Sequence, residues 1–314
     1  MKKTTRILRL VVGSILSIFI TSCSTTNLAV NSLKITLDEN NPDRNYYIAI
    51  LPENGQIDSY LVLIPGFGES ADDLLKATLL PRDASEKGIA VFIPILQNGA
   101  ETYSFSAESQ KNLQLIINDI QTRYNLSDSD YSIGGFSMGG SAAVRYAELT
   151  TEKRPASVFA IDSPLDYERF RYATERDVKI YRKGLADGDS IYVQLLEDIT
   201  PIVDDSPYLL SDTTHQAILH LRDIPIRYYI EPAEQWWLDN RQTDVLGLNI
   251  LDATAFINDL RLLGNDQAEL IITSNKGFRN NGKTYHPHSW SIVDTDDLIK
   301  WIRESTRKPA HSIR

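Results

Sequence analysis

Short apolar runs recur along most of the chain, and longer stretches with helical periodicity separate them. Most of the later runs are continuous rather than strictly alternating, which is typical of strands buried on both faces of a parallel sheet. The strands predicted in this way are Leu33–Leu37, Tyr46–Leu51, Tyr60–Ile64, Val91–Ile95, Tyr131–Ile133, Ser157–Ile161, Ile226–Ile230 and Glu269–Thr273.

The stretches between the later strands predict helices. Residues 113–120 place Leu and Ile three and four positions apart, the spacing of one buried helix face. Ser137–Leu149 is rich in small residues, and Ala253–Leu263 has an apolar side and is followed by Gly264 as a C-cap. A last helix turns apolar residues inward near position 300. This alternation of strands and helices predicts an α/β fold with a mostly parallel sheet.

One interval breaks the alternation. About sixty residues between Asp162 and Ile224 contain no clear strand and are rich in Tyr, Arg, Asp and Glu. We interpret Tyr167–Leu221 as helical, within an insertion of about 163–221 that forms a cap over the C-terminal edge of the sheet. A plain surface excursion is the alternative interpretation.

The N-terminus has the layout of a secretory signal. Four basic residues precede an apolar run, Leu10–Ile20, that is too short to span a bilayer comfortably. The run closes on Ile-Thr-Ser-Cys at 20–23, which resembles the bacterial lipobox, whose cysteine is diacylated and becomes the first residue of the mature chain. The sequence thus predicts a signal peptide at 1–22, a lipidated Cys23, a tether over 23–32 and one domain over 33–314. An ordinary signal peptide with a chance cysteine is the alternative.

Composition supports an exported globular protein. The chain has 314 residues, of which 42% are hydrophobic, enough for one large core or at most two domains. Cys23 is the single cysteine, so no intrachain disulfide forms. The formal charge of −10 disfavours nucleic-acid binding, and loss of the four basic residues in 1–22 would take it to −14. We therefore expect attachment to a bacterial membrane, on its periplasmic or outer side, through acyl chains rather than charge.

The strongest chemical motif surrounds Ser137. Residues 134–140 read Gly-Gly-Phe-Ser-Met-Gly-Gly and contain G-x-S-x-G. A nucleophile on a tight strand-to-helix turn sits in strained backbone geometry, so its neighbours must lack a bulky Cβ. A predicted strand precedes this motif and a predicted helix follows it, which is the context that the motif requires. A Gly-rich turn with a structural serine is the alternative.

With this motif in this context, the chain resembles the α/β-hydrolase superfamily, in its esterase-like branch, over nearly everything from Ile35 to Ile302. The resemblance implies a mostly parallel eight-stranded sheet flanked by helices, with a helical cap insertion. It also implies an oxyanion hole, because Pro-Gly-Phe-Gly-Glu at 65–69 is similar to the family's His-Gly-x-Gly segment. By that resemblance the N–H groups of Phe67 and Met138 are the two donors. Pro65 stands where the family often has histidine, but the donors belong to the backbone.

The family order Ser…Asp/Glu…His places the base after the last strands. His286 and His288 lie there, and His288 is followed by Ser-Trp, which resembles the His-x-Trp ending of many esterases. We favour His288 as the base and assign His286 to supporting it or to contacting substrate. The remaining histidines lie in the insertion or the C-terminal tail: His215, His220 and His311.

The acid that orients the histidine is expected after the seventh strand. Glu231 stands at the end of that strand and is the first candidate, with Glu234 as the alternate acid. Asp162, which follows the sixth strand, occupies an acid position in some relatives. No aspartate stands at the family's usual place, which leaves a glutamate or a different strand open.

Aromatic residues indicate a candidate substrate-binding surface. One of the adjacent Trp236 and Trp237 can face the cleft, and with the aromatic insertion they form a candidate shelf for sugar or aryl rings, ordinary packing being the alternative. No metal-ligand spacing and no phosphate-binding loop is present in the sequence, so no cofactor or metal is expected.

The sequence therefore predicts a serine hydrolase that cleaves a carboxylic ester through an acyl-enzyme. The expected partner is a small-molecule or glycan ester, such as an acylated or aryl-esterified carbohydrate. Three alternatives remain open: a non-catalytic binding lipoprotein on a hydrolase scaffold, an acyltransferase, and a peptidase of the same fold.

Overall fold

The computed structural model of the chain describes residues 32–127, 130–180, 190–280 and 282–307. The predicted signal peptide, Cys23 and the tether up to residue 31 lie outside these residues. Ser32, which the sequence assigns to the tether, instead begins the first strand. The helices of the described residues are all too short or too polar to cross a membrane.

Eight strands of the described residues form one sheet in the order β1-β2-β4-β3-β5-β6-β7-β8. The pairs β1–β2 and β2–β4 are antiparallel, and every pair from β4–β3 to β7–β8 is parallel. This confirms the predicted, mostly parallel sheet. The strands are β1 Ser32–Thr36, β2 Tyr46–Ile50, β3 Ser59–Ile64, β4 Ile89–Ile95, β5 Tyr131–Phe136, β6 Ser157–Ile161, β7 Ile226–Ile230 and β8 Ala268–Ile272.

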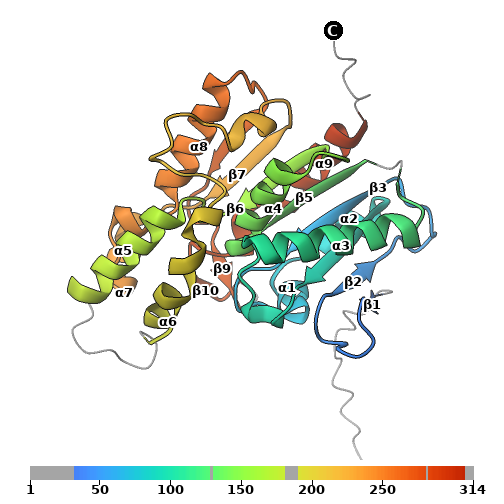
Figure 1. Ribbon diagram of the computed structural model, residues 1–314, viewed down its shortest axis with the longest axis horizontal. Helices are drawn as coiled ribbons and strands as arrows, with labels where there is room; N and C mark the ends of the chain where they lie inside the picture. The colour runs from blue at the N-terminus through green and yellow to red at the C-terminus, as the bar shows by residue number, and fades with distance from the viewer. Residues whose placement is uncertain (1–31, 128–129, 181–189, 281, 308–314) are drawn as a thin grey trace, which may run out of the picture.

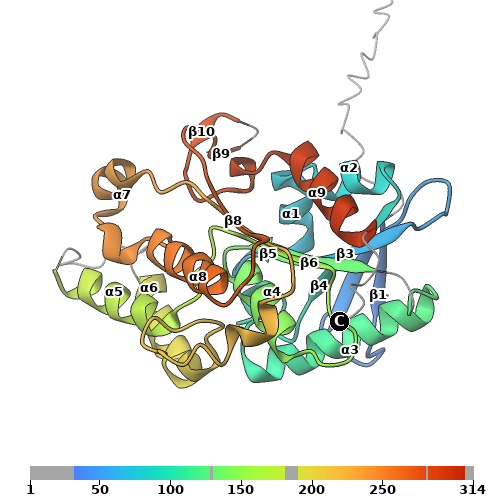
Figure 2. The same cartoon turned by 90° about the horizontal axis from the view of Figure 1, so that it is seen from above.

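Helices cover both faces of this sheet (Figure 2). Every residue of β3, β4, β5 and β6 is buried, as their continuous apolar runs require. Two apolar cores lie between the layers, one under each set of helices. On one face are α3 (Ala107–Arg123), α4 (Met138–Leu149) and α8 (Ile250–Leu262), and on the other α1 (Ala71–Ala77), α2 (Leu80–Glu86) and α9 (Thr295–Arg307).

The insertion between β6 and β7 is helical in its described residues. It contains α5 (Tyr167–Ile180), α6 (Ser190–Ile199), and the short helices η2 (Thr200–Asp205) and η3 (Ile218–Leu221). Helix α5 packs against α6, and these two helices and α7 (Glu234–Arg241) lie toward the same end of the molecule, on the left of Figure 1. The helical character predicted for this interval is therefore present.

A buried ion pair holds the start of α5 against α8. Arg169 pairs with Asp252, whose Oδ2 lies 2.8 Å from Nη2 of the guanidinium, and Nη1 donates to the carbonyl of Leu246 at 2.6 Å. Asp252 also accepts the backbone N–H groups of Leu165 and Asp166. Because both charged groups are buried, losing either one would leave the other unpaired. The insertion is thereby fixed relative to the edge of the sheet where β6 ends.

Candidate active site

Ser137 lies on the turn between β5 and α4, as the sequence predicts. Its φ of 53° and ψ of −126° are outside the regions that non-glycine residues favour. The turn is held by a hydrogen bond from its N–H to the carbonyl of Ile161 at 2.8 Å. The N-terminus of α4 begins at the next residue, so the positive end of the helix dipole lies at this serine.

The glycines of the motif are required by close backbone approach. A Cβ on Gly135 would lie 2.5 Å from the carbonyl oxygen of Ile64, and one on Gly139 would lie 2.2 Å from the same oxygen. Real Cβ atoms do not come this close to backbone atoms, so any side chain would push α4 away from β3. These glycines therefore allow the turn that presents Ser137.

The loop after β3 passes directly beside the serine. A Cβ on Gly66 would lie 3.4 Å from the Cβ of Ser137, so the backbone of the loop is within contact distance. Among the described residues, neither the N–H of Phe67 nor that of Met138 donates a hydrogen bond. Both predicted oxyanion donors therefore belong to segments that adjoin Ser137, and both are left for a ligand.

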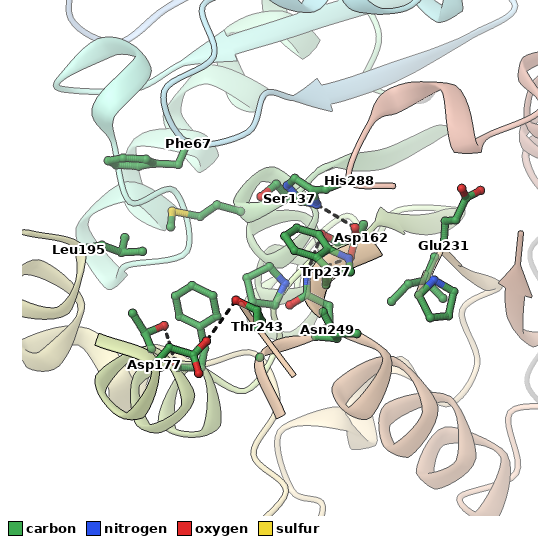
Figure 3. A pocket seen from close by; sticks show the side chains of 18 residues that line it. Phe67, Ser137, Asp162, Asp177, Leu195, Glu231, Trp237, Thr243, Asn249 and His288 are labelled. Carbon is green, nitrogen blue, oxygen red and sulfur yellow. Dashed lines mark hydrogen bonds and ion pairs between the residues drawn. The ribbon is translucent and has the colours of Figure 1, made fainter. Parts of the chain in front are cut away.

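His288 is paired with Asp162 rather than with a residue after β7. The Oδ2 atom of Asp162 lies 2.8 Å from Nδ1 of His288. The Asp162 side chain follows β6 on a backbone with φ of 44°, and the residue is only 4% exposed. Asn249 donates from Nδ2 to Oδ1 of this carboxylate at 2.9 Å and to its backbone carbonyl at 3.0 Å. The hydrogen bond to Asp162 holds the ring of His288 through Nδ1, and Figure 3 marks it with a dashed line.

His288 therefore pairs with Asp162, and neither glutamate that the sequence favours as the acid hydrogen-bonds to it. Glu231 is 1% exposed and does not bind His288, because donors from the chain after β8 saturate its carboxylate. Its donors are the Tyr285 hydroxyl at 2.7 Å, the Lys276 N–H at 2.8 Å, the Thr273 hydroxyl at 3.1 Å and the Gly277 N–H at 3.3 Å. Glu234 is exposed in the first turn of α7. Glu231 therefore anchors the segment that leads to His288.

His286 has a different environment from His288. Its ring packs on Trp236, with centroids 4.6 Å apart, and lies 6.5 Å from the ring of His288. Burial, followed by the charge of Arg279, lowers the pKa of His286 to about 3. The side chain is therefore neutral at ordinary pH and contributes to the aromatic packing beside His288.

A cavity of about 270 Å³ contains Ser137, Asp162 and His288 in its lining (Figure 3). The loop after β3, the start of α4, the insertion, α7 and the segment before α8 contribute an apolar wall: Phe67, Met138, Phe170, Leu195, Trp237 and Leu248. Both tryptophan rings contact His286, at centroid distances of 4.6 Å for Trp236 and 5.8 Å for Trp237, and Trp237 also lines the cavity. Trp237 is thus the tryptophan that faces the cleft, as the sequence predicts for one of the pair. The described residues contain no group of three His, Cys, Asp or Glu side chains able to hold a metal ion.

Asn249 is a site residue that sequence reasoning did not find. It precedes α8 and reaches Asp162 from a part of the chain with no motif. Asp162 itself carried a weak signal, since it directly follows a buried strand adjacent to the strand of Ser137. Carboxyl ends of neighbouring parallel strands meet at one edge of a sheet, which is where polar side chains converge.

No family model matches the chain, and comparison with curated proteins gives no match. Solved structures are similar over most of its length. S-formylglutathione hydrolase from Staphylococcus aureus has a TM-score of 0.54 and 14% identity, covering 88% of this chain and 98% of its own. A soluble variant of monoglyceride lipase from Saccharomyces cerevisiae has a TM-score of 0.56 and 12% identity, covering 88% of this chain and 96% of its own. Fluorophosphonate-binding serine hydrolase F from S. aureus has a TM-score of 0.52 and 17% identity, covering 88% of this chain and 99% of its own. Together with the sheet order and the flanking helices, these similarities establish that the chain has the α/β-hydrolase fold.

Proposed function

We propose that the protein is a serine hydrolase that cleaves carboxylic esters through an acyl-enzyme. The observation that carries this proposal is the convergence of Ser137, His288 and Asp162 on one cavity, with His288 held by Asp162 at 2.8 Å. Strained geometry at Ser137 and a buried carboxylate behind the histidine have little structural use, but both serve nucleophilic catalysis. The hydrolases and the lipase that share the fold are consistent with this chemistry.

In the proposed reaction, Ser137 attacks the ester carbonyl while Nε2 of His288 takes its proton. The carbonyl oxygen becomes negative and accepts hydrogen bonds from the N–H groups of Phe67 and Met138. His288 then gives the proton to the departing alcohol. A water molecule, deprotonated by His288, releases the acid and restores Ser137.

The lining of the cavity supports an ester with an apolar or ring-shaped group. A volume of about 270 Å³ suits a short acyl chain or a single ring. Trp237 lines the same cavity as His288, and sugar and aryl rings pack well on aromatic faces. We therefore include acylated or aryl-esterified carbohydrates among the proposed substrates.

The proposed activity is tested with a panel of esters: p-nitrophenyl acetate and butyrate, phenyl acetate, ethyl acetate and an acetylated glucose. We expect turnover of the p-nitrophenyl esters, with a pre-steady-state burst of p-nitrophenol where deacylation is slow. A lower KM for the phenyl and glucose esters than for ethyl acetate would support the ring-binding proposal, whereas kcat also reflects the better leaving group of the phenyl ester. Absence of turnover across the panel would contradict ester hydrolysis.

Acyl transfer to an alcohol uses the same acyl-enzyme. Adding glycerol or methanol to the ester panel and analysing the products distinguishes hydrolysis from acyl transfer. Free acid as the main product supports the hydrolase, whereas a transferred ester as the main product supports an acyltransferase.

We also propose that Cys23 is lipidated and tethers the protein to a bacterial membrane. The support is the lipobox-like segment before a lone cysteine. Expression of the full chain in a bacterial host is expected to give a mature N-terminal peptide that starts at Cys23 and carries diacylglycerol on sulfur, which mass spectrometry detects. Cys23→Ser is expected to lose this modification. A mature N-terminus elsewhere, or an unmodified Cys23, would contradict the proposal.

A further inference from the structure

Glu69 connects the two loops that flank Ser137. It closes the turn after β3, and its Oε2 accepts the backbone N–H of Gly66 at 2.9 Å. Its Oε1 accepts the indole N–H of Trp290 at 2.7 Å. One carboxylate therefore fixes both the loop that presents the N–H of Phe67 and the segment that carries His288.

The surroundings of this contact are tightly packed. Trp290 is 4% exposed, and its ring lies 5.3 Å from that of Phe136, the residue before Ser137. The ring of His288 lies 4.4 Å from the same phenylalanine. The backbone at Gly66 is also close to this ring, since a Cβ there would lie 3.1 Å from the Phe136 side chain. A shift of Glu69 would therefore displace both the loop at Gly66 and the segment at Trp290.

Electrostatics give the carboxylate a second effect. Burial raises the pKa of Glu69, while its hydrogen bonds to Gly66 and Trp290 oppose that rise. The charged form also attracts protonated His288. The same attraction favours the imidazolium that forms when His288 takes a proton from Ser137.

We propose that Glu69 is a positioning residue for the reaction at Ser137. Through Gly66 it fixes the loop that presents the N–H of Phe67, and through Trp290 it fixes the segment that carries His288. Both are thereby held in position relative to Ser137, and Glu69 itself does not touch substrate. This inference rests on the proposed function.

The test replaces Glu69 by glutamine in the full chain. Its single carbonyl oxygen can accept only one of the two N–H donors, and its amide then opposes the other. We expect kcat on p-nitrophenyl butyrate to fall by about 10- to 100-fold, part of the effect of removing an oxyanion donor. KM should change by less than about threefold, because the substrate-binding wall is untouched. Affinity for a trifluoromethyl ketone, which forms a tetrahedral adduct on serine, should fall in parallel with kcat/KM.

Two further variants complete the test. Trp290→Phe keeps an aromatic ring and leaves the contact of Glu69 with Gly66 but removes the indole donor, so it should lower kcat less than Glu69→Gln does. In the double variant the two reductions of kcat should combine less than multiplicatively. Asp72→Asn removes an exposed carboxylate in the adjacent helix α1 and should leave kcat unchanged. Thermal unfolding checks that each variant is folded.

The outcomes separate the two proposals. A wild-type protein without ester turnover would contradict the proposed function itself. With an active wild type, an unchanged kcat in Glu69→Gln would overturn the role of Glu69, as would a loss confined to KM. If Glu69→Gln does not fold, Trp290→Phe decides: a fall in kcat and in ketone affinity at unchanged KM supports the proposal, and unchanged values overturn it.

Discussion

Replacing Ser137 by alanine is expected to lower kcat on p-nitrophenyl esters by about 10⁶-fold, to the rate that the backbone donors and substrate binding sustain alone. The substitution removes only Oγ and keeps the Cβ, so the strained turn and its hydrogen bond to the carbonyl of Ile161 remain. KM and thermal stability should therefore be nearly unchanged. Steady-state kinetics with a sensitive substrate, together with thermal unfolding, measure both effects.

A matched control accompanies this variant. Ser211→Ala removes a hydroxyl from an exposed serine in the insertion, and kcat should stay at the wild-type value. If Ser137→Ala retained more than about a hundredth of the wild-type kcat, the nucleophile would have to be a different group, since removal of an attacking serine costs far more.

Asp162→Asn is expected to lower kcat by about 10⁴-fold, because it changes the tautomer of His288. Asn249 donates from its amide to Oδ1 of Asp162, so an asparagine at 162 must keep its oxygen on that side. Its NH₂ group then faces Nδ1 of His288 and requires that nitrogen to be unprotonated. The ring proton moves to Nε2, which can no longer accept the proton of Ser137.

The glutamates that the sequence favoured are the controls for this prediction. Glu234→Gln changes an exposed side chain and should alter kcat by less than about twofold. Glu231→Gln should lower the free energy of unfolding, since an amide cannot accept from all four of its donors, but should reduce kcat much less than Asp162→Asn. A loss of about 10⁴-fold in either glutamate variant, with an active Asp162→Asn, would contradict the pairing seen here.

The centre of the sheet could be predicted because its strands are buried on both faces. The predicted and observed bounds of β6 and β7 agree residue for residue, and all their residues except the half-buried Arg227 are buried. At β5 the prediction stopped at Ile133, whereas the strand continues to Phe136. Positions 134 and 135 of this strand are glycines because neighbouring atoms leave no room for a side chain. Since glycine adds nothing to an apolar pattern, the pattern did not indicate that the strand continues.

Which carboxylate pairs with His288 could not be predicted, because the pairing depends on tertiary contacts. Strands β6 and β7 are parallel neighbours, so Asp162 and Glu231 both emerge at the same edge of the sheet. What separates them is that Glu231 is saturated by donors from residues 273–285, while Asp162 keeps Oδ2 for His288. Neither those donors nor Asn249 belongs to a local motif, so the sequence pattern contains no trace of either contact.

The most direct test of the account is covalent labelling of the purified protein with a fluorophosphonate, followed by mass mapping of the modified peptide. The reagent reacts with a serine that is activated by a neighbouring base, and it needs no knowledge of the natural ester. We expect one adduct, on Ser137, that is absent in Ser137→Ala and forms much more slowly in Asp162→Asn. Labelling that persists in Ser137→Ala, or an adduct on another residue, would contradict it.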